Sequence, residues 1–255
     1  MKEREAYARV ALVTGATSGI GEATAKRFTA AGFGVVGTGR NAGKLEQLEA
    51  ELGKSFMGVA GDISGDGMVE RLFAAATGRF GKPPDIVVAN AGRGLGGSVK
   101  DADLSRFEGI LRVNVTATLA LLQRAAREML PRQAGAYPDK AADIVVVGSV
   151  VGRNISPFSA VYGATKFAVH ALTEGLRREL GPKGVRVTLV EPGITVSGFQ
   201  DAAGYSGAMV RNFEDRFGPL LVAEDVADAI QYVVSLPPRV HVSDIVIRPT
   251  RQDYP

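Results

Sequence analysis

Short apolar runs alternate with helical patterns along almost the whole chain, and this alternation limits the possible fold more than any other feature. Seven runs are predicted strands: 10–13, 35–38, 56–60, 86–89, 144–147, 185–190 and 245–247. Segments with apolar residues at helical spacing separate them, at 23–31, 44–52, 68–80, 104–129, 158–180 and 223–234. Strands that are apolar on both faces are typical of a parallel sheet covered by helices on both sides.

The alternation predicts an α/β fold in a single domain, residues 1–255, with a doubly wound seven-stranded parallel sheet. A length of 255 residues is ordinary for one such domain. Two segments depart from the pattern. Residues 131–142 are rich in turn formers and charge, and we expect them to form a surface excursion between a helix and a strand. Residues 195–218 mix glycine, polar and aromatic residues, and we expect them to form a mobile lid over the sheet edge.

Composition and charge exclude several functional classes. The formal net charge is +3 and the basic residues are dispersed, which argues against a nucleic-acid or membrane partner. The absence of cysteine excludes disulfides and thiolate chemistry, and with only His170 and His241 a histidine-rich metal site is not expected. The first 15 residues resemble neither a signal peptide nor a membrane span, so we expect a cytoplasmic protein.

A glycine-rich turn follows the first predicted strand and opens the first predicted helix, within the run Thr-Gly-Ala-Thr-Ser-Gly-Ile-Gly. Backbone N–H groups and the helix dipole at such a turn point toward an anion, so the turn is a candidate pyrophosphate site. The candidate residues are Gly15, Thr17, Ser18, Gly19, Ile20 and Gly21. Glycine-rich turns also occur where nothing binds. The G-x3-G-x-G spacing differs from the general dinucleotide pattern G-x-G-x-x-G.

Three residues form a candidate proton-transfer group. Lys166 follows Tyr162 by four positions on a predicted helix, so both side chains project from one face. A nearby positive charge lowers the pKa of a phenol, which is otherwise about 10, and prepares it for acid–base catalysis. Ser149 precedes Tyr162 by 13 positions and ends a predicted strand. A Tyr-x-x-x-Lys pair alone is common by chance.

His170, four residues beyond Lys166, is interpreted as a packing residue.

Taken together and in this order, the motifs resemble the short-chain dehydrogenase/reductase family over essentially the whole chain. The motifs are TGATSGIG, Asp62-Ile63, Asn90-Ala91-Gly92, Asn114, Ser149, Tyr162-x-x-x-Lys166 and Pro192-Gly193. The resemblance implies an extended Rossmann fold, an NAD(P)(H) cofactor, and hydride transfer between the nicotinamide and a small-molecule carbonyl or alcohol substrate. It also implies a homodimer or homotetramer assembled through the helices at 104–129 and 158–180.

The resemblance assigns a role to each of four catalytic candidates. Tyr162 would give or take the proton, and Ser149 would hydrogen-bond the substrate oxygen. Lys166 would lower the pKa of Tyr162 and bind the nicotinamide ribose. Asn114 matches the family asparagine that bends its helix and holds a water on the relay to Lys166. From the residues alone, Asn114 could equally be an ordinary helix asparagine, and Ser149 a simple strand-end residue.

By the same resemblance, three further segments hold the cofactor. Asp62 and Ile63 would line the adenine, although Asp62 could also be a turn or cap residue. The other two segments are Asn90-Ala91-Gly92, which would pass the adenine-side ribose, and Pro192-Gly193 with Thr195, which would close over the nicotinamide. Ser197 stands where the family often has threonine.

The end of the second strand favours NADP(H) over NAD(H). Enzymes that use NAD place an acidic residue there to hold the ribose 2′-hydroxyl. This chain has Gly39 at that position, followed by Arg40 and Asn41, both predicted to contact the cofactor. A guanidinium can clamp a 2′-phosphate in a bidentate manner, although Arg40 could also be only a solvated loop residue.

The substrate is the least constrained part. Residues 93–97, 150–158 and 198–217 are expected to line the pocket, and Arg153 or Arg211 could bind a substrate carboxylate. The segment 247–250 (IRPT) resembles the subgroup of NADP-dependent dehydrogenases that act on serine and other 3-hydroxy acids. Two other functions stay open: a non-catalytic NADP(H)-binding regulator or scaffold, and an epimerase or dehydratase that uses the same three residues.

Overall fold

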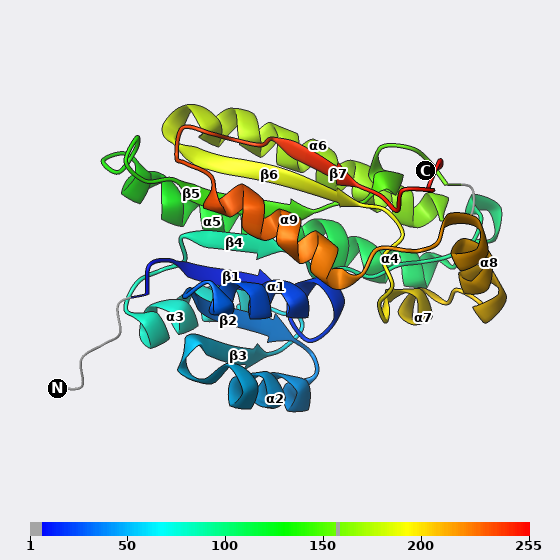
Figure 1. Cartoon of the computed structure of the whole chain (residues 1–255), viewed down its shortest axis with the longest axis horizontal. Helices are drawn as coiled ribbons and strands as arrows, with labels where there is room; N and C mark the ends of the chain where they lie inside the picture. Colours follow the sequence, from blue (N-terminus) through cyan, green and yellow to red (C-terminus); the bar gives the residue numbers. More distant parts are fainter. Residues whose placement is uncertain (1–6, 157–158) are drawn as a thin grey trace.

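A seven-stranded parallel sheet organises the molecule (Figure 1) in the computed structural model, which describes residues 7–156 and 159–255. The strand order is β3-β2-β1-β4-β5-β6-β7. The strands are β1 (Val10–Thr14), β2 (Gly34–Gly39), β3 (Phe56–Ala60), β4 (Ile86–Ala89), β5 (Ala142–Val147), β6 (Val185–Pro192) and β7 (Asp244–Ile247). The extended Rossmann fold predicted from the alternation of strands and helices is confirmed.

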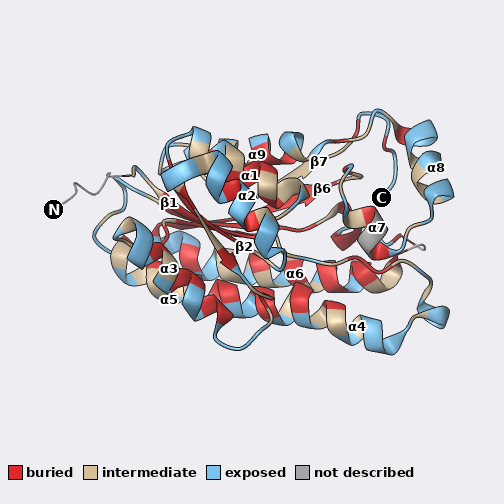
Figure 2. Ribbon diagram, turned by 90° about the horizontal axis from the view of Figure 1, so that it is seen from below, coloured by how far each residue is buried: buried red, intermediate tan, exposed pale blue. Residues whose placement is uncertain are grey.

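Helices cover both faces of the sheet. One face is covered by α1 (Gly19–Ala30), α2 (Ala42–Leu52) and α9 (Ala223–Ser235) (Figure 2). The other is covered by α3 (Met68–Phe80), α4 (Leu104–Leu111), α5 (Thr118–Gln133) and α6 (Ala160–Leu180). No helix within the described residues is long and apolar enough to span a bilayer.

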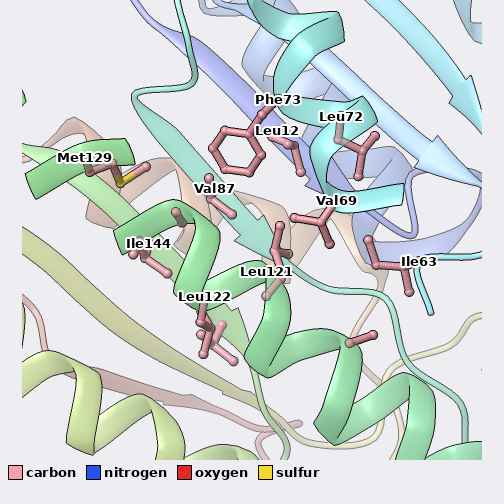
Figure 3. Close-up of a cluster of buried hydrophobic side chains, with 14 of the residues drawn as sticks. Leu12, Ile63, Val69, Leu72, Phe73, Val87, Leu121, Leu122, Met129 and Ile144 are labelled. Atoms are coloured by element: carbon pink, nitrogen blue, oxygen red, sulfur yellow. The ribbon is translucent and has the colours of Figure 1, made fainter. Parts of the chain in front are cut away.

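Alternating side chains of the central strands enter two separate hydrophobic cores. In β1, Val10 and Leu12 pack toward α3 and α5, whereas Ala11 and Val13 pack toward α1 and α9. Figure 3 shows the first core, where Phe73, Leu121 and other side chains of α3 and α5 meet the strand residues. Because both faces of the sheet are buried at its centre, β1 and β4 carry apolar side chains on both faces, which explains their continuous apolar runs.

Several predicted boundaries differ from the structure, and one lies outside the described residues. The segment predicted as one helix at 104–129 contains a π-helical turn, Arg112–Ala117, between α4 and α5. Helix α5 continues through Pro131 to Gln133, so the surface excursion begins later than predicted. The buried Gln133 side chain donates a hydrogen bond to the carbonyl of Lys140 and anchors this last turn. Helix α6 begins at Ala160, and the predicted start at Phe158 lies outside the described residues.

The parallel arrangement brings the carboxyl ends of the strands to one edge of the sheet. The loops that follow the strands gather at this edge, at the right of Figure 1. Two short helices of the predicted lid segment, α7 (Phe199–Ala203) and α8 (Gly207–Phe217), lie beyond it. Ligands of open α/β sheets bind outside the carboxyl ends of the strands, so this edge is where a functional site is expected.

Candidate active site

A cleft of about 770 Å³ lies at the carboxyl edge of the sheet and brings most of the predicted site residues together. Its lining includes Gly15, Thr17, Ser18, Gly19, Ile20, Arg40, Asp62, Ile63, Asn90, Ala91, Gly92, Ser149, Tyr162, Lys166, Pro192, Gly193 and Thr195. Three predicted residues do not line it: Gly21, Asn41 and Asn114. Residues scattered over 180 positions therefore converge on one surface because each follows or faces a strand end.

The glycine-rich turn has a shape that excludes side chains. Gly15 and Gly19 have φ angles of +69° and +51°, which favour glycine. A Cβ atom on Gly15 would lie 2.8 Å from Nδ2 of Asn90, and one on Gly21 would lie 2.2 Å from the Gly15 carbonyl oxygen. Gly21 therefore allows α1 to pack against its own turn. Ser18, the N-cap of α1, makes no side-chain capping bond. The N–H groups at the start of α1 are thus available to an anion in the cleft.

The end of β2 cannot accommodate the acidic residue of NAD-binding sites without rearrangement. A Cβ atom on Gly39 would lie 2.5 Å from Cγ2 of Thr17. Arg40 is exposed at the cleft and forms no ion pair or side-chain hydrogen bond with the described residues. Asn41 instead caps α2, since its Oδ1 accepts a hydrogen bond of 3.0 Å from the N–H of Lys44. Of the two predicted contacts, only Arg40 is placed to meet a ligand.

Asp62 is both a turn residue and a cleft residue. Its Oδ1 accepts hydrogen bonds from the N–H and Oγ of Ser64, at 2.9 and 2.6 Å. Its Oδ2 lies 3.2 Å from the guanidinium of Arg93. The hydrogen bonds from Ser64 are the main reason that the pKa of Asp62 lies below its usual value, and Arg93 and Arg40 act in the same direction. Asp62 is therefore an ionised acceptor at the cleft.

Tyr162 and Lys166 project from one face of α6 into the cleft, as their spacing predicts. Each is 7% exposed. Nζ of Lys166 donates a 2.8 Å hydrogen bond to the carbonyl of Val147, at the end of β5, and lies 5.9 Å from the centre of the Tyr162 ring. Ser149 follows β5 and lies close enough to Tyr162 to hydrogen-bond its phenol.

The predicted lowering of the Tyr162 pKa by Lys166 is not found in the protein alone. Burial raises the pKa of Tyr162 above its usual value, Tyr205 adds to the increase, and the hydrogen bond with Ser149 opposes it. Burial also lowers the pKa of Lys166 to about 8. Low-dielectric surroundings disfavour both charged forms. Burial therefore sets the direction of both pKa shifts.

Asn114 lies in the π-helical turn and connects two segments of the site. Its Oδ1 accepts a hydrogen bond from the N–H of Arg93 at 2.8 Å, and its Nδ2 donates to the Arg93 carbonyl at 2.9 Å. Nδ2 also donates to Oγ1 of Thr165 on α6, at 3.0 Å. The π-helical turn agrees with the expected distortion of the helix. The side chain holds the loop after β4 against α6 from behind the cleft.

The part of the cleft that was predicted to bind the substrate is lined by some residues that the sequence predicted and by others that it did not. Phe199, Tyr205 and Phe213 come from the predicted lid, and the Phe199 ring lies 5.4 Å from that of Tyr162. The contribution of α4 was missed, namely Ser105, Arg106, Gly109, Ile110 and, just beyond it, Val113. Gln252 was also missed, because one buried glutamine near the chain end has no sequence pattern that identifies it.

The two arginines proposed for a substrate carboxylate do not line the cleft. Arg153 pairs with the buried carboxylate of Glu191 through two hydrogen bonds and also contacts Asp244. Arg211 projects from α8 outside the lining. A buried carboxylate is stable only with a charged partner. Arg153 therefore points toward Glu191 and away from the cleft. The arginines that line the cleft are Arg40, Arg93 and Arg106.

The chain belongs to the short chain dehydrogenase family, whose model matches residues 9–205. It is an oxidoreductase of this family. It is 34% identical to the serine 3-dehydrogenase of Agrobacterium fabrum over 245 residues, which are 95% of this chain and 94% of that protein. An uncharacterised oxidoreductase of Staphylococcus epidermidis is 33% identical over 241 residues, 94% of this chain and 97% of the relative.

Two solved structures resemble the fold over nearly its whole length. The closed form of a serine dehydrogenase complexed with NADP+ has a TM-score of 0.86 and 31% identity, and 96% of each chain is covered. A 3-ketoacyl-(acyl-carrier-protein) reductase from Brucella melitensis complexed with NADH also has a TM-score of 0.86, with 30% identity and 96% and 98% coverage. Relatives of similar distance thus bind different nicotinamide cofactors.

Proposed function

We propose that the protein is an NADP(H)-dependent oxidoreductase that interconverts a carbonyl and an alcohol by hydride transfer. One observation carries the proposal: Ser149, Tyr162 and Lys166 line the same cleft as the glycine-rich turn and Arg40, which forms no ion pair or side-chain hydrogen bond with the described residues. The cleft therefore combines a proton donor with a long site suited to a phosphorylated dinucleotide. A nucleotide-binding regulator would have no need for the buried tyrosine and lysine.

The residues of the cleft fit NADP(H) along its length. The N–H groups of the glycine-rich turn would bind the pyrophosphate, and Arg40 would pair with the 2′-phosphate. Asp62 and Ile63 would contact the adenine, and the turn from Pro192 to Thr195 would cover the nicotinamide. The steric conflict between a side chain at position 39 and Thr17 supports NADP(H) over NAD(H). When bound, the cofactor supplies or accepts the hydride.

Tyr162 serves as the acid–base residue in this proposal. A phenol whose pKa is raised keeps its proton at neutral pH, so Tyr162 is ready to donate it to the oxygen of a carbonyl substrate. Ser149 donates a hydrogen bond to the same oxygen and stabilises its developing negative charge. In the oxidation direction Tyr162 must ionise first, and the protonated Lys166 favours the phenolate.

Tyr162→Phe tests the proposed role directly. The variant should lose about 10²–10⁴-fold in kcat, the contribution of general acid catalysis, while NADPH affinity by fluorescence titration stays nearly unchanged. Turnover is followed as NADPH absorbance with a panel of carbonyls and alcohols. The exposed Tyr232 of α9 gives the matched control Tyr232→Phe, which should be fully active. Full activity of Tyr162→Phe would refute the acid–base role, and an inactive wild type that binds NADPH tightly would favour the regulator.

Arg40→Asp tests the cofactor preference. Loss of a charge-assisted hydrogen bond should weaken NADPH binding roughly 10- to 100-fold and leave NADH binding almost unaffected. The control Arg71→Asp changes an exposed arginine of α3 outside the cleft and should affect neither cofactor. Equal losses for both cofactors would mean that the 2′-phosphate is recognised elsewhere.

Three further features stay predictions of the sequence. We propose that α7 and α8 act as a lid over the substrate, because they carry Phe199, Tyr205 and Phe213 to the cleft. We also propose a homodimer or homotetramer assembled through the helices from 104 to 129 and α6, in the cytoplasm. Light scattering that shows a monomer at assay concentrations would contradict the proposed assembly.

A further inference from the structure

A chain of polar side chains, of which Glu191 is fully buried and Arg153 is half exposed, contacts the backbone of Ser149 and takes no part in the cleft. It consists of His170 on α6, Glu191 at the end of β6, and Arg153 after the short turn that follows Ser149. None of the three lines the cleft. The mechanism proposed above uses none of them, yet burying a histidine and a carboxylate is costly unless their contacts compensate.

The imidazole of His170 sits in a slot between two glycines that flank Ser149. A Cβ atom on Gly148 would lie 2.4 Å from Nε2 of His170, and one on Gly152 would lie 2.5 Å from Cε1 and Nε2. Neither glycine has a positive φ, so the backbone itself would accept a side chain at both positions. The close approach of the histidine ring is therefore what requires glycine on both sides of Ser149.

The hydrogen bonds define which ring nitrogen carries the proton. The N–H of Ser149 donates to Nε2 of His170 at 3.3 Å, so Nε2 must present a lone pair. The proton is then on Nδ1, which lies 3.7 Å from Oε2 of Glu191. Glu191 is completely buried, and Arg153 holds it through Nε and Nη2 at 2.9 and 2.5 Å. A carboxylate beside Nδ1 favours this tautomer.

His170 is neutral at physiological pH in this setting. Burial lowers its pKa to about 4 and is the largest cause. Among the charged groups around it, Glu191 and Asp244 raise the pKa, whereas Lys166 and Arg153 lower it. A protonated ring would lose the acceptor for the Ser149 N–H. The environment therefore keeps the acceptor available.

We propose that His170 is a positioning residue that fixes the Ser149 loop relative to Tyr162. One face of α6 carries Tyr162, Lys166 and His170 at intervals of four residues. The proposed proton donor, Tyr162, and the residue that holds the Ser149 loop, His170, are therefore fixed on the same helix. Because hydride and proton transfer need accurate alignment, a displacement of about 1 Å in a positioning group can cost about 10²-fold. This inference rests on the proposed function.

The kinetic test compares three variants. His170→Leu removes the acceptor and should lower kcat about 10- to 100-fold, with an unchanged dissociation constant for NADPH. His170→Gln can return an oxygen acceptor to the position of Nε2 and should recover much of the activity. The control Thr173→Val removes a side-chain hydrogen bond to Val169 one turn further along α6, and should lower stability without lowering kcat. Equal kcat in His170→Leu and the wild type would overturn the proposal, and so would equal losses in His170→Leu and His170→Gln.

A second measurement does not depend on turnover. Nitrogen-15 NMR of the labelled histidines should show His170 with a protonated Nδ1 and an unprotonated Nε2 from pH 8 down to pH 5. The Nε2-protonated tautomer, or titration of His170 near pH 6.5, would overturn the proposal. Because this experiment uses the wild-type protein, it decides the question even if His170→Leu does not fold. The wild-type protein could show the expected tautomer and yet reduce no carbonyl. This result would confirm the hydrogen bond between Ser149 and His170, but it would refute the proposed function and therefore the role of His170 in positioning a catalytic serine.

Discussion

Each end of the sheet contains a buried carboxylate that pairs with an arginine, but the arginine is buried at one end and half exposed at the other. At the amino ends of the strands, Arg186 binds Asp143 through two hydrogen bonds of 2.7 and 3.0 Å. Arg9 adds a contact of 2.5 Å to the same carboxylate. Arg186 also donates to the backbone carbonyls of Val234, Leu236, Pro237 and Val240. Arg186 and Asp143 thus each have several partners, all within the protein.

At the carboxyl ends, several buried groups lack comparable partners. Burial shifts the pKa values of Tyr162, Lys166 and His170, in each case away from the charged form. The pair of Glu191 with Arg153 serves the neighbouring histidine and the loop of Ser149. Burial of charge at the amino end thus stabilises the fold, whereas in the proposed function burial at the carboxyl end prepares groups to exchange protons.

Removal of Asp143 should give the largest loss of stability. Asp143→Ala leaves the Arg186 guanidinium buried without its carboxylate, and breaking such a pair costs about 3–5 kcal/mol. Activity per folded molecule should stay near the wild-type value, because this end lies far from the cleft. Urea denaturation gives the free energy of unfolding. Asp101→Ala, in an exposed turn, is the control with little expected effect. A stable variant with impaired turnover would reverse the comparison between the ends.

Lys166→Met should raise the free energy of unfolding, which Asp143→Ala lowers, and its effect should be the next largest. Burial lowers the pKa of Lys166 from 10.5 to about 8. Between these values the unfolded chain binds more protons than the folded one, so the stability of the wild type rises with pH through this window. Below pH 8 the full penalty applies, up to about 3 kcal/mol. Loss of the hydrogen bond to Val147 offsets part of the gain, so the variant should be about 1–3 kcal/mol more stable at pH 7, and inactive.

The gain from Lys166→Met should shrink as the pH rises through 8 and disappear by about pH 10.5. Thermal unfolding at pH 7, 9 and 10 without cofactor follows this trend. Lys183→Met, in an exposed turn, should show no such pH dependence. If Lys166→Met is less stable than the wild type at pH 7, the contacts of Lys166 compensate its burial as fully as Asp143 compensates the burial of Arg186. The contrast between the two ends would then fail.

Gln252→Leu should weaken cofactor binding about tenfold. Oε1 of Gln252 accepts a 2.9 Å hydrogen bond from the N–H of Ile194, and a Cβ atom on Gly193 would lie only 2.4 Å from the same oxygen. The side chain thus supports the turn proposed to cover the nicotinamide. A donor left without a partner costs about 1–3 kcal/mol, which corresponds to about tenfold or more in affinity.

Fluorescence titration with NADPH measures this change, and Arg251→Ala, at the exposed neighbouring position, should bind NADPH normally. If Gln252→Leu lowers the free energy of unfolding but not the affinity for NADPH, then Gln252 stabilises the fold, as Arg186 and Asp143 do, and does not support the cofactor site.

The sequence predicted the fold and the central site because both depend on regular spacing. Continuous apolar runs identify strands buried on both faces, and an i, i+4 pair identifies one helix face, as for Tyr162 and Lys166. Helix boundaries were less accurate, because the π-helical turn around Asn114 and the passage of α5 through Pro131 depend on tertiary contacts.

Residues whose partners are distant in sequence could not be assigned in the same way. Arg153 looked like a substrate-binding residue, yet its partner Glu191 lies 38 positions away. His170 looked like a packing residue because nothing in its local sequence indicates the Ser149 N–H, 21 positions earlier. The predicted direction of the Tyr162 pKa shift was also wrong, because burial, which depends on the whole folded chain, raises this pKa.

Asp244→Asn should have the smallest effect and isolates the part played by burial. Asp244 and Glu191 contact the same guanidinium of Arg153, at 3.1 and 2.5 Å, but Asp244 is half exposed, whereas Glu191 is completely buried. Water screens the exposed carboxylate, so its removal should cost about 0–1 kcal/mol and leave kcat unchanged. Glu191→Gln, measured beside it, should lower kcat because it removes the charge that favours the Nδ1–H tautomer of His170. If the two substitutions had equal effects on turnover, the total charge around Arg153 would matter and the buried contact to His170 would not.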